Sequence, residues 1–368
     1  MDRRTVLAAP LALAACGERS QAADAIEAPT AAPPPSAPAT PAAPLPALRE
    51  LAKFPLGVMV TSDDLDKPQV TALAARHFSQ ITPGLELKME VLLKDDFSLD
   101  FTRADRIAGW AAANRQRLFG HCLVWYAEDM PAFNRLDGDR KAFAAAYDRY
   151  IAQVAGRYRG RIVGWDVVNE TVSDDGSGLR PSLWASNLGD EDHIVRAFEQ
   201  ARAADPTAVL FLNDYGLEVW PKKRAAFLRL VERLLKRGAP LGGLGCQSHI
   251  DIDIAPGAST TAIRELARFG LPIHVSEADC SIKPKALGLR SREEKLRLQA
   301  AWYREVLDAF TVLPPQQRFA FTIWGVRDDG SWLNSEREYK GADAPLLFDA
   351  QGGAKPAFRA IADGLRRG

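Results

Sequence analysis

Eight short apolar segments, separated by segments with helical spacing, constrain the fold of this chain more than any other feature. Segments of this length that are apolar on both faces are typical of parallel strands covered by helices. Turn-forming residues and helix-like repeats separate them along the chain. The predicted strands are 54–61, 77–82, 117–125, 161–169, 208–214, 243–250, 272–279 and 319–326.

Two of the intervening segments show the helical repeat clearly. In 193–206 and in 225–238, apolar residues recur at i, i+3, i+4 and i+7, and Gly238 follows the second segment where a helix would end. Eight such units predict an α/β fold, a (β/α)8 TIM barrel forming a single domain over 47–368. An open doubly wound sheet is the alternative, but it would carry a Gly-rich phosphate loop after the first strand, and 59–66 reads "MVTSDDLD".

The first 46 residues do not resemble a folded domain. Residues 1–16 combine Arg3 and Arg4 with a short apolar run and end at Cys16, which predicts a signal peptide. "LAAC" resembles the lipobox of bacterial lipoproteins, and the arginine pair weakly resembles the twin-arginine export signal. Residues 17–46 are rich in Ala and Pro and have almost no large apolar side chains, so they predict a disordered linker. We expect an exported lipoprotein, anchored to a bacterial membrane through Cys16 and facing the periplasm or the cell surface.

The charge and the cysteine spacing argue against two classes of function, nucleic-acid binding and a metal site built from cysteines. The 368-residue chain has a formal net charge of zero and no basic stripe, which argues against a nucleic-acid partner. Cys122, Cys246 and Cys280 have neither CxxC nor metal-ligand spacing, so we expect small buried strand residues. No metal or cofactor pattern is present in the sequence.

Polar and aromatic side chains collect where six of the predicted strands end. In a (β/α)8 barrel the carboxyl ends of all strands meet at one rim, where the catalytic groups of such enzymes lie. Each residue alone has an ordinary structural explanation, as a solvated loop residue or as core. Together they predict one site, made of His121, Trp125, Asn169, Glu170, Asn213, Asp214, Gln247, His249, Glu277, Asp279 and Trp324.

Glu170 and Glu277, at the ends of the fourth and seventh predicted strands, suggest the chemistry. Two carboxylates across a cleft can hydrolyse a glycosidic bond: one protonates the leaving oxygen, and the other attacks the anomeric carbon or activates water. His249 would hold Glu277 ionised, and Asp279 would orient the imidazole. Asn169 would bond a sugar hydroxyl.

Six segments resemble the motifs of the family 10 glycoside hydrolases, the retaining endo-β-1,4-xylanases. "WDVVNE" matches the acid/base motif of that family letter for letter, and "HVSEADCSI" resembles its nucleophile segment. The resemblance extends from Leu56 to Phe358, with every motif in family order. The other four segments are "GHCLVW", "LFLNDYGLE", "GLGCQSHI" and "FTIWGVRDDGSWL".

The resemblance implies roles for individual residues, and no metal or cofactor. Glu170 would be the general acid/base, and Glu277 the nucleophile that forms a glycosyl-enzyme intermediate. A xylan or xylo-oligosaccharide substrate and a monomeric protein are also implied. The resemblance implies that Asn169 would hold the 2-hydroxyl of the sugar at the cleavage site, and that Gln247 and His249 would support Glu277, with Asp279 behind His249. It further implies a glycone side of the cleft lined by Lys88, His121, Trp125, Trp324 and Trp332, and an aglycone side that includes Tyr215.

The chain departs from the family pattern on the glycone side. Where the family has PENEMKW, this sequence reads "PGLELKM", so Gly84 and Leu85 replace two sugar-binding polar residues, and Met89 replaces a Trp. Lys88 is retained, Tyr126 replaces a His, and a one-residue insertion follows in "AEDMP". The sequence therefore predicts an endo-1,4-β-xylanase. Two alternatives remain open: the same mechanism on another β-1,4-glycan or short β-glycoside, and a non-catalytic carbohydrate-binding lipoprotein.

Overall fold

The first and last strands of the chain pair with each other and close the sheet into a barrel. The computed structural model describes residues 45–128, 130–283, 290–334 and 341–367. In it, β1 (Leu56–Val60) is parallel to both β2 (Gln80–Pro83) and β9 (Arg318–Ile323). From β2 the ring continues through β3 (Arg117–Trp125), β4 (Ile162–Asn169), β5 (Val209–Asp214) and β6 (Gly243–Cys246) to β8 (Ile273–Ser281), which returns to β9.

The sixth and seventh predicted strands differ from the observed ones. The segment 243–250 is divided into β6 and β7 (His249–Asp251) because the backbone turns at Ser248, whose φ is +64°. β8 extends two residues past Asp279 and pairs with β7 there. Glu277 therefore lies in the middle of β8 and not at its end, which sets its carboxylate into the floor of the rim.

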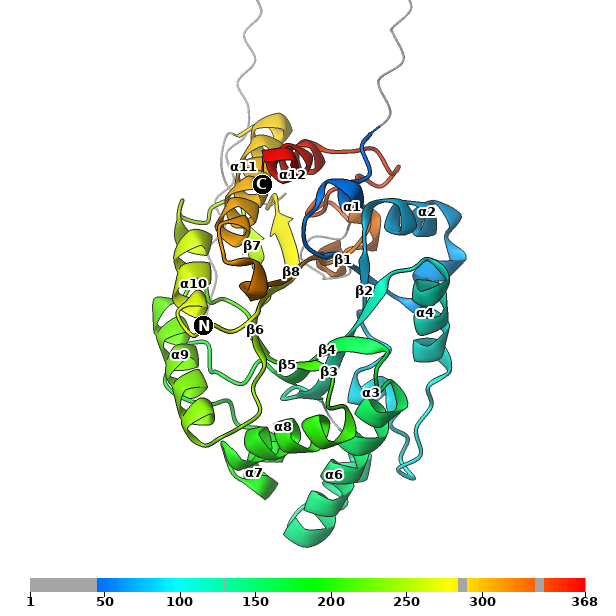
Figure 1. Ribbon diagram of the computed structural model, residues 1–368, viewed down its shortest axis with the longest axis vertical. Helices are drawn as coiled ribbons and strands as arrows, with labels where there is room; N and C mark the ends of the chain where they lie inside the picture. The colour runs from blue at the N-terminus through cyan, green and yellow to red at the C-terminus, as the bar shows by residue number, and fades with distance from the viewer. Residues whose placement is uncertain (1–44, 129, 284–289, 335–340, 368) are drawn as a thin grey trace, which may run out of the picture. The chain divides into compact units, whose positions relative to one another are not determined.

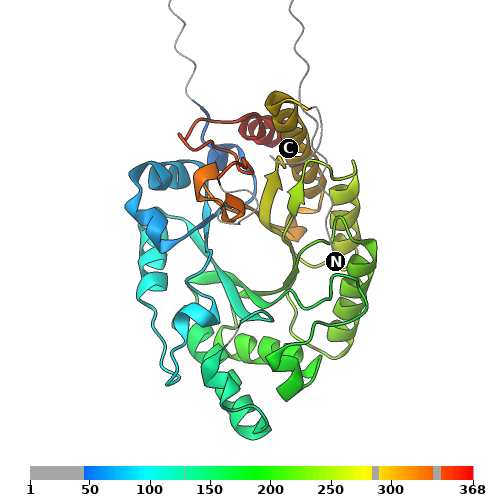
Figure 2. The same ribbon diagram turned by 180° about the vertical axis from the view of Figure 1, so that it is seen from behind.

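Helices form a ring outside the strands (Figure 1), and the view from behind shows the same ring around the barrel (Figure 2). Short 3-10 turns occur at Ser62–Asp66, Pro315–Gln317, Asp328–Gly330 and Trp332–Asn334. The helices are α1 (Leu48–Leu51), α2 (Pro68–His77), α3 (Met89–Leu92), α4 (Thr102–Ala113), α5 (Pro131–Asn134), α6 (Arg140–Arg157), α7 (Leu183–Leu188), α8 (Asp192–Ala204), α9 (Pro221–Lys236), α10 (Ala258–Ala267), α11 (Arg292–Thr311) and α12 (Pro356–Arg367).

The helical faces predicted from the repeat are the buried faces. In α9, Phe227, Leu230, Val231 and Leu234 are buried, and the chain leaves the helix at Gly238 with a φ of +77°. A left-handed residue at this place suits glycine, because it has no Cβ to clash with the preceding turn. The sequence pattern therefore specified both the buried face and the end of this helix.

Aromatic rings fill the inside of the barrel. Phe119, Phe211, His274 and Phe319 come from four different strands, and their ring centroids lie between 4.4 and 5.8 Å apart. A Cβ at Gly243 would lie 2.3 Å from Phe211, so glycine is required there to admit the ring. The barrel is thus a packed core that supports the site at its rim.

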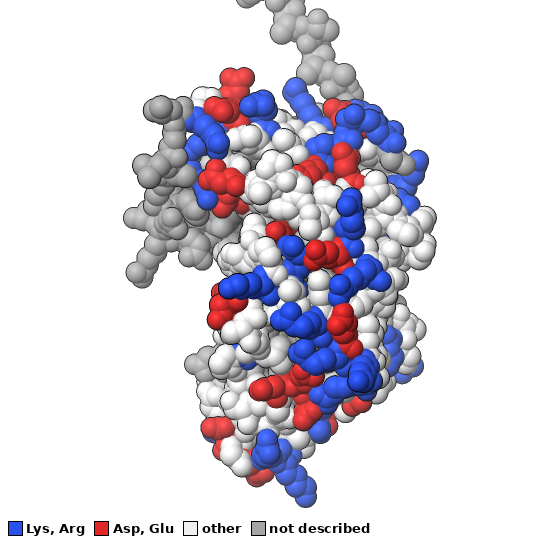
Figure 3. All heavy atoms as spheres, turned by 90° about the vertical axis from the view of Figure 1, so that its left-hand side faces the viewer, with Lys and Arg blue, Asp and Glu red and all other residues white. Residues whose placement is uncertain are grey.

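The three cysteines of the described residues are buried and unpaired, as predicted for Cys122, Cys246 and Cys280. The predicted signal peptide with Cys16 and residues 17–44 of the predicted linker lie outside the described residues. Among the helices of the described part, none combines the length and the apolar character that crossing a bilayer requires. On the face over α9 and α10, cationic and anionic side chains lie next to one another (Figure 3), and one of the ion pairs there joins Arg268 to Glu232.

Candidate active site

The carboxyl ends of the strands surround a cleft of about 810 Å³. Its lining includes both predicted catalytic carboxylates, Glu170 and Glu277, and the structure therefore brings together residues that are far apart in the sequence. Three predicted site residues, Asn213, Asp214 and Asp279, do not line this cleft; Asp279 lies behind His249. The other predicted site residues in the lining are Lys88, His121, Trp125, Asn169, Tyr215, Gln247, His249, Trp324 and Trp332.

Glu277 is buried in the floor of the cleft, where donors hold both of its carboxylate oxygens. Asn213 donates from Nδ2 to Oε1 at 2.9 Å, and His249 Nε2 lies 3.1 Å from Oε2. His121 Nδ1 lies 3.9 Å from Oε1. A carboxylate that is fixed at both oxygens keeps one orientation, as a nucleophile must for an in-line attack.

The charges around Glu277 keep it ionised despite its burial. Burial alone would raise the pKa of Glu277, but His121, His249 and Lys88 outweigh that effect and lower the pKa to about 2. Burial also acts to lower the pKa of His249, but Asp279 and Glu277 raise it well above its usual range. The Asp279–His249–Glu277 chain, with its 2.9 Å and 3.1 Å contacts, is therefore a carboxylate–imidazolium–carboxylate arrangement.

Removal of His249 is expected to move the pH dependence of the reaction. In a His249→Ala variant Glu277 loses a donor and a neighbouring positive charge, so its pKa should rise by about 1 unit. The acid limb of kcat/KM for the free enzyme should move to higher pH by the same amount. The measurement is a pH–rate profile on a soluble oligosaccharide. An acid limb at the same pH as in the unmodified protein would contradict this electrostatic role.

Glu170 directly follows β4, and three side chains contact its carboxylate. Trp125 donates from Nε1 to Oε2 at 2.7 Å, while Gln247 and Asn169 donate to Oε1 at 3.0 and 3.2 Å. Its backbone has a φ of +58°, and its N–H donates to the carbonyl of Asn213 on the neighbouring strand. The half-buried side chain is thus aimed into the cleft by a strained backbone turn that β5 holds in place.

Gln247 acts differently from what the family resemblance implied. The Gln247 side-chain amide donates to Glu170 Oε1 at 3.0 Å and to Asn169 Oδ1 at 3.2 Å. Gln247 contacts Glu277 through the backbone, where the Gln247 carbonyl accepts a hydrogen bond from the N–H of Glu277. The side chain therefore orients the predicted acid/base. The physical reason is the turn after β6, which points the amide toward β4.

The predicted site residue Asn213 belongs to the same network, and so does Asp166, which the sequence reasoning did not identify. Asp166 Oδ2 lies 2.8 Å from His121 Nδ1, and both side chains are buried. Burial raises the pKa of Asp166 to about 6, although His121 opposes the rise. Asn213 Nδ2 also donates to Asn169 Oδ1 at 2.9 Å. An Asp within the apolar run 161–169 was the available signal, because a buried acid needs a partner.

Glu128 is a second buried acid that sequence reasoning did not identify. It accepts hydrogen bonds from the backbone N–H groups of Met89, at 2.7 Å, and Trp125, at 3.3 Å. It thereby ties the segment that carries Lys88 to the end of β3. Burial raises the pKa of Glu128 to about 8, and the two backbone donors only partly offset this effect.

The protonation of Glu128 should make the stability of the protein depend on pH. Its folded pKa lies above the ordinary value of 4.5, so its contribution to stability is lost as pH rises from about 4.5 through about 8. We expect the melting temperature of the unmodified protein to fall relative to that of a Glu128→Gln variant between pH 5 and pH 8. Thermal unfolding at several pH values tests this; a constant difference would show that Glu128 does not titrate in this window.

The walls of the cleft combine aromatic faces with one apolar surface. The Lys88 ammonium lies 4.3 Å from the centroid of Trp125, while Trp332 is 39% exposed and donates from Nε1 to Asp279. The buried Trp324 packs edge-on to His121, with ring centroids 5.2 Å apart. On the side where the sequence departs from the family, Leu85 is 43% exposed in the cleft, so an apolar side chain faces the substrate space there.

The donor atoms of three of these side chains lie close enough together to hold a metal ion. In the described part of the chain, His121, Asp166 and Glu277 have donor atoms within 4.8 Å of one another. Direct contacts among the three, with Asn213 and His249 as further partners of Glu277, account for this spacing. The three groups therefore form a buried network of hydrogen bonds and ion pairs around the Glu277 carboxylate.

Comparisons with known proteins agree with this geometry. The chain is 34% identical to "Endo-1,4-beta-xylanase C" of Paenibacillus barcinonensis, in a match that covers 85% of this chain and 31% of the relative. It is 35% identical to "Exoglucanase XynX" of Acetivibrio thermocellus, in a match that covers 84% of this chain and 28% of the relative. It thus spans about a third of the length of these curated relatives.

A solved structure of "xylanase10C" from Cellvibrio japonicus, in complex with xylopentaose, superimposes with a TM-score of 0.82. It is 29% identical and matches over 88% of this chain and 69% of that one. The sequence model of the family described as "Glycosyl hydrolase family 10" matches residues 47–364, nearly the whole described barrel. The chain belongs to glycosyl hydrolase family 10.

Proposed function

We propose that this protein is an endo-1,4-β-xylanase that hydrolyses internal β-1,4-xylosidic bonds of xylan or xylo-oligosaccharides with retention of configuration. The observation that carries the proposal is the buried Glu277, kept ionised by histidines, beside Glu170 in an open cleft. A protein that only bound carbohydrate would gain nothing from a buried anion fixed at both oxygens, because burying charge is costly.

In the first step, a carboxylate oxygen of Glu277 forms a bond to the anomeric carbon while the bond to the leaving oxygen breaks. Glu170 transfers its proton to that oxygen. In the second step, Glu170 takes a proton from water, the hydroxide attacks the anomeric carbon, and the bond to Glu277 breaks. Asn169, whose amide contacts both Glu170 and Asn213, is placed to bond a hydroxyl of the reacting sugar.

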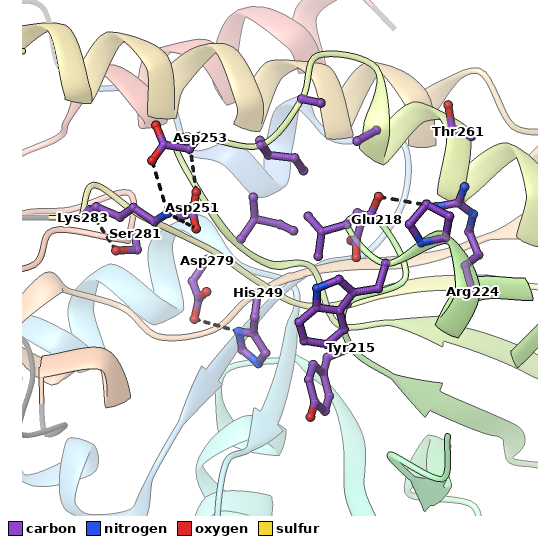
Figure 4. A pocket seen from close by; sticks show the side chains of 18 of the residues that line it. Tyr215, Glu218, Arg224, His249, Asp251, Asp253, Thr261, Asp279, Ser281 and Lys283 are labelled. Atoms are coloured by element: carbon purple, nitrogen blue, oxygen red, sulfur yellow. Dashed lines mark hydrogen bonds and ion pairs between the residues drawn. The ribbon is translucent and has the colours of Figure 1, made fainter. Parts of the chain in front are cut away.

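Internal cleavage needs binding space on both sides of the carboxylates. The cleft continues into a second groove of about 740 Å³, and the two share Tyr215, His249 and Trp332. Figure 4 looks into this groove, where Asp251 and Lys283 lie on one side, away from Tyr215. The xylanase names of relatives and the xylopentaose complex of a structural neighbour support xylan as the substrate class.

Product analysis tests this proposal. The full chain should release xylo-oligosaccharides of several lengths from xylan, and proton NMR at early times should show the β-anomer of the new reducing end. Initial release of the α-anomer would contradict the retaining mechanism. The same chain with Glu277→Ala is the control for contaminating activity.

A second substrate class is favoured by the exposed Leu85 and by the relative named an exoglucanase. The same two carboxylates would then act on another β-1,4-glycan or on a short β-glycoside. Activity on mixed-linkage glucan or an aryl β-glycoside that depends on Glu277, without release from xylan, would favour this candidate.

For location, we propose an exported, monomeric lipoprotein anchored through Cys16, with 17–46 as the linker and the twin-arginine pathway as one export route. The support is the sequence pattern alone. Labelling of a bacterial host with an alkyne fatty acid should mark the full chain, and Cys16→Ser should remove the label and release the protein from the membrane fraction. An unlabelled parent protein would contradict the proposed anchor.

A further inference from the structure

Trp220 exposes its ring at the border of the second groove, beyond the residues predicted to bind substrate. It is 40% exposed, and the preceding residue, Val219, is 41% exposed. Both line the groove that shares Tyr215 with the catalytic cleft. Scattered exposed apolar residues are common and need no explanation. Val219 and Trp220, however, are adjacent in the chain and both line a groove that is continuous with the cleft that holds Glu170 and Glu277.

The Trp220 ring is held firmly although it is exposed. A Cβ at Gly216 would lie 2.4 Å from the ring, so the ring packs directly on the backbone of the loop. The backbone N–H of Trp220 also donates to the Gly216 carbonyl. Gly216 has a φ of +69°, which favours glycine for a second, independent reason. The ring lies edge-on to Tyr215, with the two centroids 5.7 Å apart.

A buried lysine supports both rings. Lys223 Nζ lies 3.5 Å from the centroid of Tyr215 and 5.5 Å from that of Trp220, and it forms ion pairs with Asp214 and Asp174 at 2.9 and 3.2 Å. Lys223 is fully buried. A ring that is packed against glycine and a buried lysine loses little side-chain entropy when a ligand covers its exposed surface.

We propose that Trp220 is a distal sugar-binding platform for the part of a β-1,4-linked chain that extends from the catalytic carboxylates past Tyr215. The proposal rests on the proposed function and adds to it a determinant of chain-length preference. A flat apolar ring with polar neighbours suits a sugar ring, which has apolar C–H faces and hydroxyls at its edge. Asp251, Asp253 and Lys283, which line the same groove, offer polar partners for such hydroxyls.

The test compares kcat/KM on substrates of increasing length for Trp220→Leu and Trp220→Tyr in the full chain. The Leu variant keeps apolar bulk without a planar face, so its kcat/KM on xylohexaose and xylan should fall about tenfold. Its kcat/KM on an aryl β-xylobioside, too short to reach Trp220, should stay within about twofold of the parent. The Tyr variant should recover most of the loss, and Leu235→Ala, which removes another exposed apolar side chain, from the helix α9 that follows Trp220, should match the parent on every substrate.

Two results would overturn the proposal. Equal losses on short and long substrates would mean that Trp220 only supports Tyr215, and no loss on any substrate would mean that the groove is not occupied. Failure of the proposed function would look different, because the parent protein itself would not release products from xylan. In that case the same variants are compared on cello-oligosaccharides, and an unchanged dependence on length would overturn the platform.

Discussion

Replacing Glu277 with Ala is expected to lower kcat on xylan by a factor on the order of 10⁴ to 10⁶, the loss seen when an enzyme loses its nucleophile. The loss should be this large because the described side chains that contact Glu277 are hydrogen-bond donors, Asn213, His249 and His121, and none of these three is a carboxylate that could replace it. Initial rates of reducing-sugar release measure the loss.

The Glu277→Ala variant should still bind xylo-oligosaccharides, because Lys88, Trp125 and Trp324 remain in the cleft. Calorimetric titration with xylotetraose checks this. Glu232→Ala is the matched control, since it removes an exposed, ion-paired glutamate far from the cleft, and it should leave activity within about twofold of the parent. Residual activity above about 1% in Glu277→Ala would assign the nucleophile to another group.

Replacing Glu170 with Ala is expected to give a loss that depends on the leaving group. On xylan, where the leaving oxygen needs a proton, kcat/KM should fall about 10²–10⁴-fold. An aryl β-xylobioside with an acidic phenol as leaving group needs little protonation, so its kcat/KM should fall much less. The slow step then becomes hydrolysis of the glycosyl-enzyme, which has lost its base.

Azide separates these two roles of Glu170. As a small anion that needs no deprotonation, it should attack the anomeric carbon of the intermediate in the Glu170→Ala variant, raise kcat on the aryl substrate and yield a β-glycosyl azide. The unmodified protein should show no such gain. An equal loss on both substrates, without rescue by azide, would remove Glu170 from the acid/base role.

Sequence patterns were most informative where local physics decides the outcome. The helix over α9 was recognisable because its apolar face repeats every 3.6 residues and because Gly238 follows it. The strands were recognisable because both of their faces are covered and therefore apolar, as in β8, whose nine residues are all buried. Glu170 and Glu277 were recognisable because each is a charged residue directly after, or within, an apolar strand.

Contacts between strands were not readable in the same way. The roles of Asp166 and Glu128 depend on partners that lie 45 and 39 residues away, His121 and Met89, and no local pattern carries that pairing. The contact between the Gln247 side chain and Glu170 could not be predicted either, because the direction of that side chain depends on the turn at Ser248, where the chain leaves β6.

The sequence by itself therefore determined the barrel, the order of its strands and the two carboxylates, because burial periodicity and residue chemistry are local properties. Only the tertiary structure decided how those carboxylates are held. The ionised state of Glu277 depends on His121 and His249, which arrive from β3 and β7, and the aim of Glu170 depends on Trp125 and Gln247. Charge and hydrogen bonding act over a few ångströms in space, and closure of the barrel alone brings these groups within that range.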